Sequence, residues 1–254
     1  MRIWQQLGLT AILSAFAVSA TAQVTIPAAA SMQLGGGTLD LSGTDLQVGG
    51  TFGTGSGSVA SARNISILAG GLFDAGSGAI GLSGNWSNLG NFVAGTSVVS
   101  FVDGGLAQTV IAGATTFYDA SFVSTTGKNY VFPVGATQTF TNALTVLGTA
   151  STGIEFRSST PGLAAFVDLL TGGTQNIDFV GVSNVHGTGQ ILAPTRTNDG
   201  GTGDDTGWFG AAIAVLAAVP APTLTTLGML LFVFTMIYPA TRRYRVRPDR
   251  TVSF

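Results

Sequence analysis

The sequence contains no cysteine and a single histidine, and charged residues make up only 9% of its 254 residues. Without cysteine the chain can form neither a disulfide framework nor a thiolate zinc site, and thiol nucleophiles are excluded. The lone histidine, His186, excludes a multi-histidine metal site. Stability must therefore come from packing and backbone hydrogen bonds.

The few charges are unevenly distributed. Residues 23–210 contain four basic and eleven acidic residues, which gives this part of the chain a net charge of −7. A surface of that sign does not attract nucleic acid, so we expect no nucleic-acid partner. Most of the remaining basic residues crowd the C-terminus: Arg242, Arg243, Arg245, Arg247 and Arg250.

The first 22 residues have the pattern of a secretory signal peptide. Arg2 supplies a positive start, residues 7–18 form an uncharged apolar run, and Ala20 and Ala22 are the small residues of a cleavage site before Gln23. The alternative is an N-terminal membrane anchor, but the run is shorter than the roughly 20 residues that span a bilayer. We therefore expect residues 1–22 to be removed on export.

A second uncharged run, residues 224–240, is long enough to span or nearly span a bilayer and is followed by two arginines. Because positive residues stay on the cytoplasmic side, the preceding chain should face outwards. The sequence thus predicts an ectodomain at 23–210, an Ala/Pro linker with a motif at 211–222, a transmembrane helix at 223–241 and a basic cytoplasmic tail at 242–254.

A short proline-containing motif, the hydrophobic run and the arginine pair together resemble the C-terminal sorting domains known as IPTL-CTERM and PEP-CTERM. Ala221 stands where the first family has isoleucine and the second has glutamate, and the residues that follow it favour the first family. The residues that carry the resemblance are Pro220, Pro222, Thr223, Leu224, Gly228, Arg242 and Arg243.

This resemblance implies recognition by an exosortase-type membrane transpeptidase and cleavage near the motif. The ectodomain would then reach the cell surface or extracellular matrix of a Gram-negative bacterium. A plain single-pass anchor, which keeps the protein in the inner membrane with its ectodomain in the periplasm, would show the same apolar run and arginines. Both interpretations remain open from the sequence.

The ectodomain repeats one pattern, in which four or five residues alternate between apolar and polar before a turn rich in small and polar residues. This pattern is typical of strands and not of helices. Examples occur at residues 38–41, 45–48, 64–67, 99–102 and 176–179, and glycine pairs or runs separate them at 35–37, 49–50, 70–71, 104–105 and 172–173.

Many short strands with small turns predict an all-β fold, either a β-sandwich or a right-handed parallel β-helix, and the texture favours the β-helix. Residues 84–209 also resemble the repeats of bacterial β-helix surface and adhesin-like proteins, through stretches such as 84–92 and a Gly-Trp ending at Trp208. Since an open solenoid end exposes backbone and apolar groups, we expect Trp208 and Phe209 to belong to a C-terminal cap.

Few residues suggest catalysis. His186 could serve a serine hydrolase, but no Gly-x-Ser-x-Gly elbow occurs in a strand-to-helix context. Glu155 with Asp168 or Asp178 could form a glycosidase pair, as in β-helix enzymes that cleave polysaccharides. Isolated acids on alternating strand positions are more often solvent-facing, so we expect no catalytic residues.

Three aspartates, Asp199, Asp204 and Asp205, are candidate calcium ligands on a glycine-rich loop, although their spacing matches no complete EF-hand loop. Asn64 and Asn85 fit the N-glycosylation pattern, which is weak support in a bacterium. No cofactor is expected. The sequence predicts a structural or adhesive surface protein whose partners are the sorting enzyme, exopolysaccharide or copies of itself, with a polysaccharide-degrading enzyme as the alternative.

Overall fold

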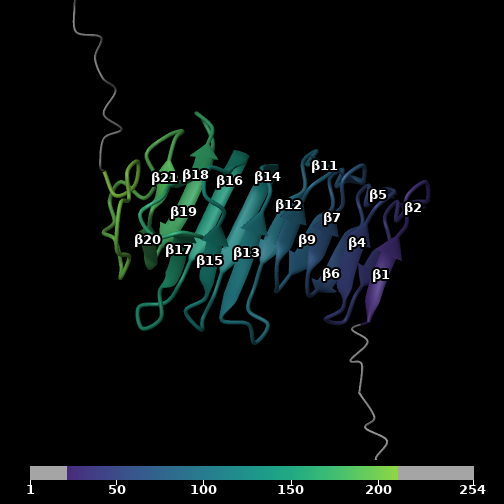
Figure 1. Ribbon diagram of the computed structural model, residues 1–254, viewed down its shortest axis with the longest axis horizontal. Helices are drawn as coiled ribbons and strands as arrows, with labels where there is room; N and C mark the ends of the chain where they lie inside the picture. The colour runs from purple at the N-terminus through teal and green to yellow at the C-terminus, as the bar shows by residue number, and fades with distance from the viewer. Residues whose placement is uncertain (1–21, 211–254) are drawn as a thin grey trace, which may run out of the picture. The chain divides into compact units, whose positions relative to one another are not determined.

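The computed structural model describes residues 22–210, where the chain forms 21 β-strands and no helix (Figure 1). Every pairing between these strands is parallel. The expected solenoid is confirmed, and the β-sandwich alternative is wrong. Within the described range no helix is long and apolar enough to cross a membrane. The signal peptide, sorting motif, transmembrane helix and basic tail lie outside the described residues, apart from Ala22.

Three sheets run along the solenoid. Sheet 1 contains one strand from each of eight turns: β1 (Gln23–Ile26), β4 (Asp45–Val48), β7 (Ile65–Ile67), β10 (Trp86–Asn88), β13 (Gln108–Ala112), β15 (Asn129–Phe132), β17 (Ile154–Ser158) and β20 (Val180–Ser183). Sheet 2 contains β2 (Ser31–Gln33), β5 (Thr51–Gly53), β8 (Leu72–Asp74) and β11 (Asn91–Val93). Sheet 3 contains β3 (Thr38–Asp40), β6 (Ser58–Ala62), β9 (Ala79–Leu82), β12 (Val98–Phe101), β14 (Thr115–Val123), β16 (Thr137–Leu147), β18 (Ala165–Leu169) and β21 (Val185–Gly187), and β19 (Thr174–Asp178) also pairs with β16.

The turns change shape along the chain. Each of the first four has three short strands, whereas β14 and β16 are continuous strands of nine and eleven residues. Their register shifts between Phe117 and Asp119, where each strand bends. In these turns one bent strand therefore replaces the separate sheet 2 and sheet 3 strands of the earlier turns. The three-strand turn then returns, because β18 pairs with the first half of β16 and β19 with the second half.

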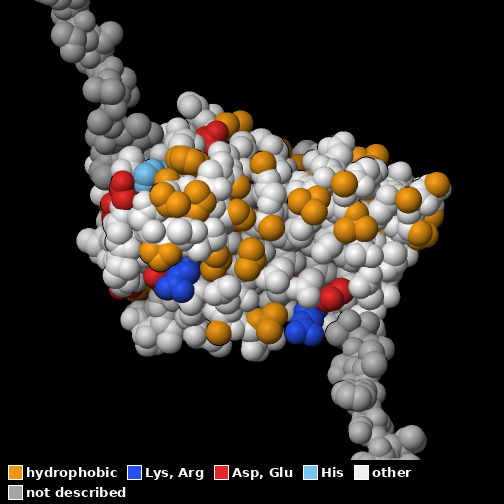
Figure 2. Space-filling view, viewed as in Figure 1, with side chains coloured by type: hydrophobic (Ala, Val, Ile, Leu, Met, Phe, Trp, Pro, Cys, Tyr) orange, Lys and Arg blue, Asp and Glu red, His pale blue; other side chains and the backbone are white. Residues whose placement is uncertain are grey.

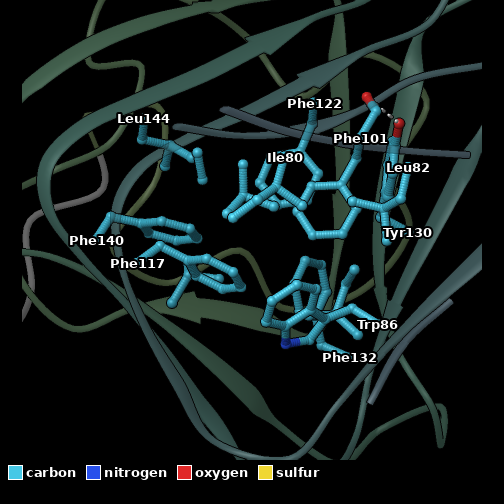
Figure 3. Packing of buried hydrophobic residues seen from close by; sticks show 14 of the residues in the cluster. Ile80, Leu82, Trp86, Phe101, Phe117, Phe122, Tyr130, Phe132, Phe140 and Leu144 are labelled. Carbon is cyan, nitrogen blue, oxygen red and sulfur yellow. Dashed lines mark hydrogen bonds between the residues drawn. The ribbon is translucent and has the colours of Figure 1, made fainter. Parts of the chain in front are cut away.

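Stacked apolar side chains fill the interior. Along each strand every second side chain points inwards. Because the strands pair in parallel, each inward side chain stacks against the equivalent side chain of the next turn. On sheet 2, for example, Phe52 pairs with Phe73 and Phe73 with Phe92. On sheet 3 the rings of Phe101 and Phe122 stack with centroids 4.6 Å apart and planes 1° apart (Figure 3). Each buried ring of this kind contributes about 1.5–3 kcal/mol through the hydrophobic effect.

Trp86 lies at the centre of this core. It is fully buried, it packs edge-on against Phe92 at 4.9 Å, and its indole nitrogen donates a hydrogen bond to Thr115 Oγ1 at 3.1 Å. The tryptophan of the Gly84–Phe92 stretch is therefore a packing residue, with its single polar atom satisfied.

The corners of the solenoid use glycine and asparagine. A Cβ on Gly50 would lie 2.2 Å from the carbonyl oxygen of Ala30, so the turn between β4 and β5 requires glycine for close approach. At the corner that leads into sheet 1, Asn64 Nδ2 donates to Asp45 Oδ1 at 2.8 Å, and Asn64 Oδ1 accepts the backbone N–H of Asn85 at 2.7 Å. Both asparagines of the glycosylation pattern thus take part in a hydrogen-bond ladder, since Asn85 Oδ1 also accepts from Val110 N.

The C-terminal end of the solenoid is closed, as expected. Trp208 is fully buried, its ring centroid lies 5.9 Å from that of Phe156, and its backbone bridges to Leu192. Phe209 N donates to the Leu192 carbonyl at 2.8 Å. Beside them, the Asn198 side chain accepts from Val182 N and donates to Val182 O, both at 2.9 Å, so one amide occupies the free edge of β20.

Candidate functional site

The three carboxylates considered for glycosidase chemistry occupy three strands of one turn. Glu155 is on β17, Asp168 on β18 and Asp178 at the end of β19. Glu155 Oε2 pairs with Arg157 at 3.3 Å, whereas Asp178 Oδ2 pairs with Arg196 at 3.0 Å. Two of the acids therefore have separate basic partners, and no hydrogen bond between the described residues links any two of the three.

His186 is paired with an acid and an aromatic ring. Its Nε2 lies 3.3 Å from Asp204 Oδ2, and its ring meets Phe166 edge-on at 5.9 Å. Hydrogen bonds from Thr206, together with the nearby His186, lower the pKa of Asp204 despite a small opposing effect of burial. No serine hydroxyl is hydrogen-bonded to the imidazole in the described part of the chain, so the arrangement of a serine hydrolase is not formed.

The candidate calcium ligands are used by their own loop. Asp204 Oδ1 accepts from Thr206 N at 2.9 Å and from Thr206 Oγ1 at 2.6 Å, and Asp205 Oδ2 accepts from Asn198 Nδ2 at 3.0 Å. Asp199 lines a different hollow, together with Asp178 and Arg196. Across residues 22–210 no group of three or more metal-ligating side chains converges.

A groove of about 310 Å³, lined by polar side chains and by Val131 and Pro161, lies on the outer face of sheet 1, near its C-terminal end. At its floor Val131, Arg157 and Ser183 occupy equivalent register positions on β15, β17 and β20. The surrounding chain adds further hydroxyl and amide groups, from Gln108, Ser159, Asn184 and Thr202.

The guanidinium of Arg157 is held in place by a chain of contacts. Thr202 N donates to Ser183 Oγ at 2.8 Å, and Ser183 Oγ donates to Glu155 Oε1 at 3.2 Å. The other oxygen of Glu155 pairs with Arg157, whose side chain remains 42% exposed. Glu155 occupies only part of the guanidinium, and Arg157 lines the groove, so its remaining N–H donors can bind a carboxylate or hydroxyl there.

A second hollow of about 310 Å³ lies at the opposite end of β20. Its main features are the Arg196–Asp178 pair and the ring of Phe179, which is 37% exposed. Phe179 has a φ of 51°, an uncommon conformation for a bulky residue, and this presents its ring at the corner. The four residues of β20 separate the two hollows, a span of about 13 Å.

Charge is sparse on the face of the solenoid drawn in Figure 2, which shows few basic and acidic side chains among hydrophobic and other uncharged ones. Of the four basic residues in the described range, Lys128 is fully buried, Arg157 and Arg196 are each paired with an acid, and Arg63 is exposed. Sequence reasoning did not single out Arg157. The available signal was the Glu155-x-Arg157 spacing, which places both side chains on the same face of a strand.

No protein-family model, curated protein or solved structure matches the chain. A function can therefore be argued only from the geometry of the chain itself.

Proposed function

We propose that this protein is an exported cell-surface or matrix protein with a structural and adhesive role, and that its ectodomain binds a polysaccharide carrying carboxylate groups. The observation that carries the proposal is Arg157, a partly exposed side chain that pairs with Glu155, which Ser183 holds in turn, in a groove that also presents neutral hydroxyl and amide groups. A planar guanidinium suits a carboxylate, and the neutral groups suit sugar hydroxyls.

The second hollow extends the same surface. Phe179 offers an apolar ring and Thr195 and Thr197 offer hydroxyls, a combination that suits a sugar ring with one apolar face. The net charge of the ectodomain is negative, and the second hollow has Asp178 and Asp199 beside its one arginine, so in this proposal the carboxylate groups bind in the Arg157 groove and an uncharged part of the polymer lies in the second hollow. The role is non-catalytic in this proposal, because Glu155 is committed to Arg157 and Ser183.

Export and sorting belong to the same proposal and rest on the sequence. Signal cleavage before Gln23 would release the chain, and an exosortase-type enzyme would act near Pro222-Thr223-Leu224. The right-handed winding of the solenoid is also proposed, since parallel crossover connections are right-handed with very few exceptions. Retention in the inner membrane is the alternative. Mass spectrometry of the mature protein distinguishes them, because an intact arginine-rich C-terminus would contradict sorting.

Binding is tested with the purified mature protein on immobilised polygalacturonate and on neutral dextran. Arg157→Gln should lower the affinity for polygalacturonate about tenfold or more, because the guanidinium–carboxylate hydrogen bonds are lost. Arg63→Gln is the matched control, since it removes the same charge from an exposed residue at another corner. Equal loss in the two variants would contradict a specific groove, and release of shortened or unsaturated sugars would support the enzyme alternative.

A further inference from the structure

The two ends of the solenoid differ. The C-terminal end is covered by the loop that carries Asn198 and Trp208. At the other end β1, β2 and β3 are the terminal strands of sheets 1, 2 and 3, and within residues 22–210 no strand pairs with their outer edges. Figure 1 shows β1 and β2 at the purple end of the ladder.

The hydrogen bonds of the second turn reveal which backbone groups remain free. The carbonyl of Ala22, just before β1, accepts from Asp45 N at 3.5 Å, and the carbonyl of Ile26 on β1 accepts from Gly49 N at 2.8 Å. Because the backbone groups of a parallel strand alternate in direction, those of Gln23 and Thr25 point away from β4. The same alternation leaves Ser31 and Gln33 free on β2, and Thr38 and Asp40 free on β3.

The apolar layer behind these edges also lacks a cover in the described chain. Val24, Met32 and Leu39 point inwards but are only partly buried. Their counterparts one turn later, Leu46, Phe52 and Val59, are 1%, 0% and 1% exposed. The three edge strands contain no lysine or arginine, the residues that commonly protect an open edge.

We propose that two copies of this protein join head to head through their N-terminal turns, with β1, β2 and β3 of each copy pairing antiparallel across a two-fold axis. The inference rests on the proposed export, because cleavage before Gln23 makes the first residue of β1 the first residue of the chain. No preceding segment then remains to cover the edge. Pairing head to tail is blocked by the closed C-terminal end.

Under the proposed sorting, the C-terminal linker is too short to provide the cover. After sorting, residues 211–222 extend at most about 40 Å. The eight strands of sheet 1 already span about 34 Å at the normal strand spacing, so too few residues remain to pair with three edges. A head-to-head pair places the two Arg157 grooves at opposite ends, and one pair could thus link two polysaccharide chains.

Single cysteines test the proposal in the full exported chain, which has none of its own. Thr25→Cys, Gln33→Cys and Thr38→Cys each place a thiol on one open edge. A two-fold axis perpendicular to the solenoid places one of the three edges opposite the same edge of the partner and exchanges the other two. At least one of the variants should therefore form a covalent dimer under mild oxidation. Ser66→Cys is the matched control on the outer face of sheet 1, two turns inside, and should remain monomeric.

Adding Thr25→Pro to Gln33→Cys or Thr38→Cys, or Thr38→Pro to Thr25→Cys, should lower the dimer yield of the variant that cross-links at least fivefold, because each proline removes an edge N–H without breaking a bond to the second turn. N-terminal mass analysis accompanies each gel. A chain that starts at Gln23 and gives no dimer overturns the pairing but leaves polysaccharide binding intact. A chain that keeps its leader overturns both the pairing and the proposed export. Dimers that form equally with Ser66→Cys would show random contact and also overturn the pairing.

Discussion

Lys128 Nζ donates a hydrogen bond to the carbonyl oxygen of Val102 at 2.8 Å, inside the corner that leads from sheet 3 to sheet 1. It also donates to the carbonyl oxygen of Ser83, and it lies 5.7 Å from the centroid of the Tyr130 ring. Burial lowers the pKa of Lys128, and the carboxylate of Asp103 partly opposes that effect. One buried ammonium thus connects the corners of three successive turns.

We predict that Lys128→Met lowers the free energy of unfolding by about 1–3 kcal/mol, because the carbonyl of Val102 loses its buried donor. Urea denaturation of the mature protein measures the change. Arg63→Met serves as the control, since Arg63 is exposed, and it should change stability by less than about 0.5 kcal/mol. A Lys128→Met protein as stable as the wild type would show that the ammonium contributes nothing net.

Tyr130 predicts a dependence on alkaline pH. Burial, with a smaller contribution from the Asp103 carboxylate, raises the pKa of the Tyr130 hydroxyl above its usual value of 10. The unfolded chain therefore loses this proton first, and stability falls as the pH rises above 10. Tyr130→Phe removes the ionising hydroxyl, so the free energy of unfolding of this variant should decline less steeply than that of the wild type between pH 10 and 11.5 in urea titrations. Lys128 is present in both proteins and cancels in the comparison, and parallel pH curves would contradict the prediction.

Gly50 predicts a steric effect at a corner. A Cβ there would lie 2.2 Å from Ala30 O and 2.4 Å from Pro27 O, both of which are backbone atoms. Gly50→Ala should destabilise the protein by about 1–3 kcal/mol because the first two turns must move apart. Gly36→Ala is the control, because its nearest contact would be Ser56 Oγ at 3.4 Å. Equal melting temperatures for the two variants would contradict the requirement for glycine.

Much of this fold could be predicted from the sequence because its signals are local. The alternation in residues 45–48 reappears as the burial pattern of β4, and the glycine pairs fall at corners. The burial of Trp208 also follows from a local cue, a Gly-Trp ending where a solenoid needs a cap.

Other features depend on which turns lie against each other. Nothing near Lys128 in the sequence indicates that a charged side chain reaches Ser83, 45 residues earlier. The separation of Glu155, Asp168 and Asp178 onto different strands follows from the corner positions, which vary between turns. The Arg157 groove needs Thr202 from the cap loop, so it exists only once the last turns have stacked.

Trp208 predicts how the closed end contributes to stability. Because each turn of a solenoid contacts only its neighbours, loss of the cap should first loosen the last turns and not the whole rod. Trp208→Ala removes a fully buried ring that packs 5.9 Å from Phe156, at an expected cost of about 3–5 kcal/mol. Hydrogen exchange should then accelerate in β20 and β21 at least tenfold while β4 and β7 stay protected.

The control for this prediction is Phe209→Ala, which removes a neighbouring ring that is only partly buried and should affect exchange less. Uniform acceleration along all turns would indicate that the solenoid unfolds as one cooperative unit, contrary to the prediction. Local loosening of β20 and β21 should also weaken polysaccharide binding, because Ser183 of β20 holds Glu155 beside Arg157. Loss of binding in Trp208→Ala without any change at Arg157 would thus connect the cap to the groove.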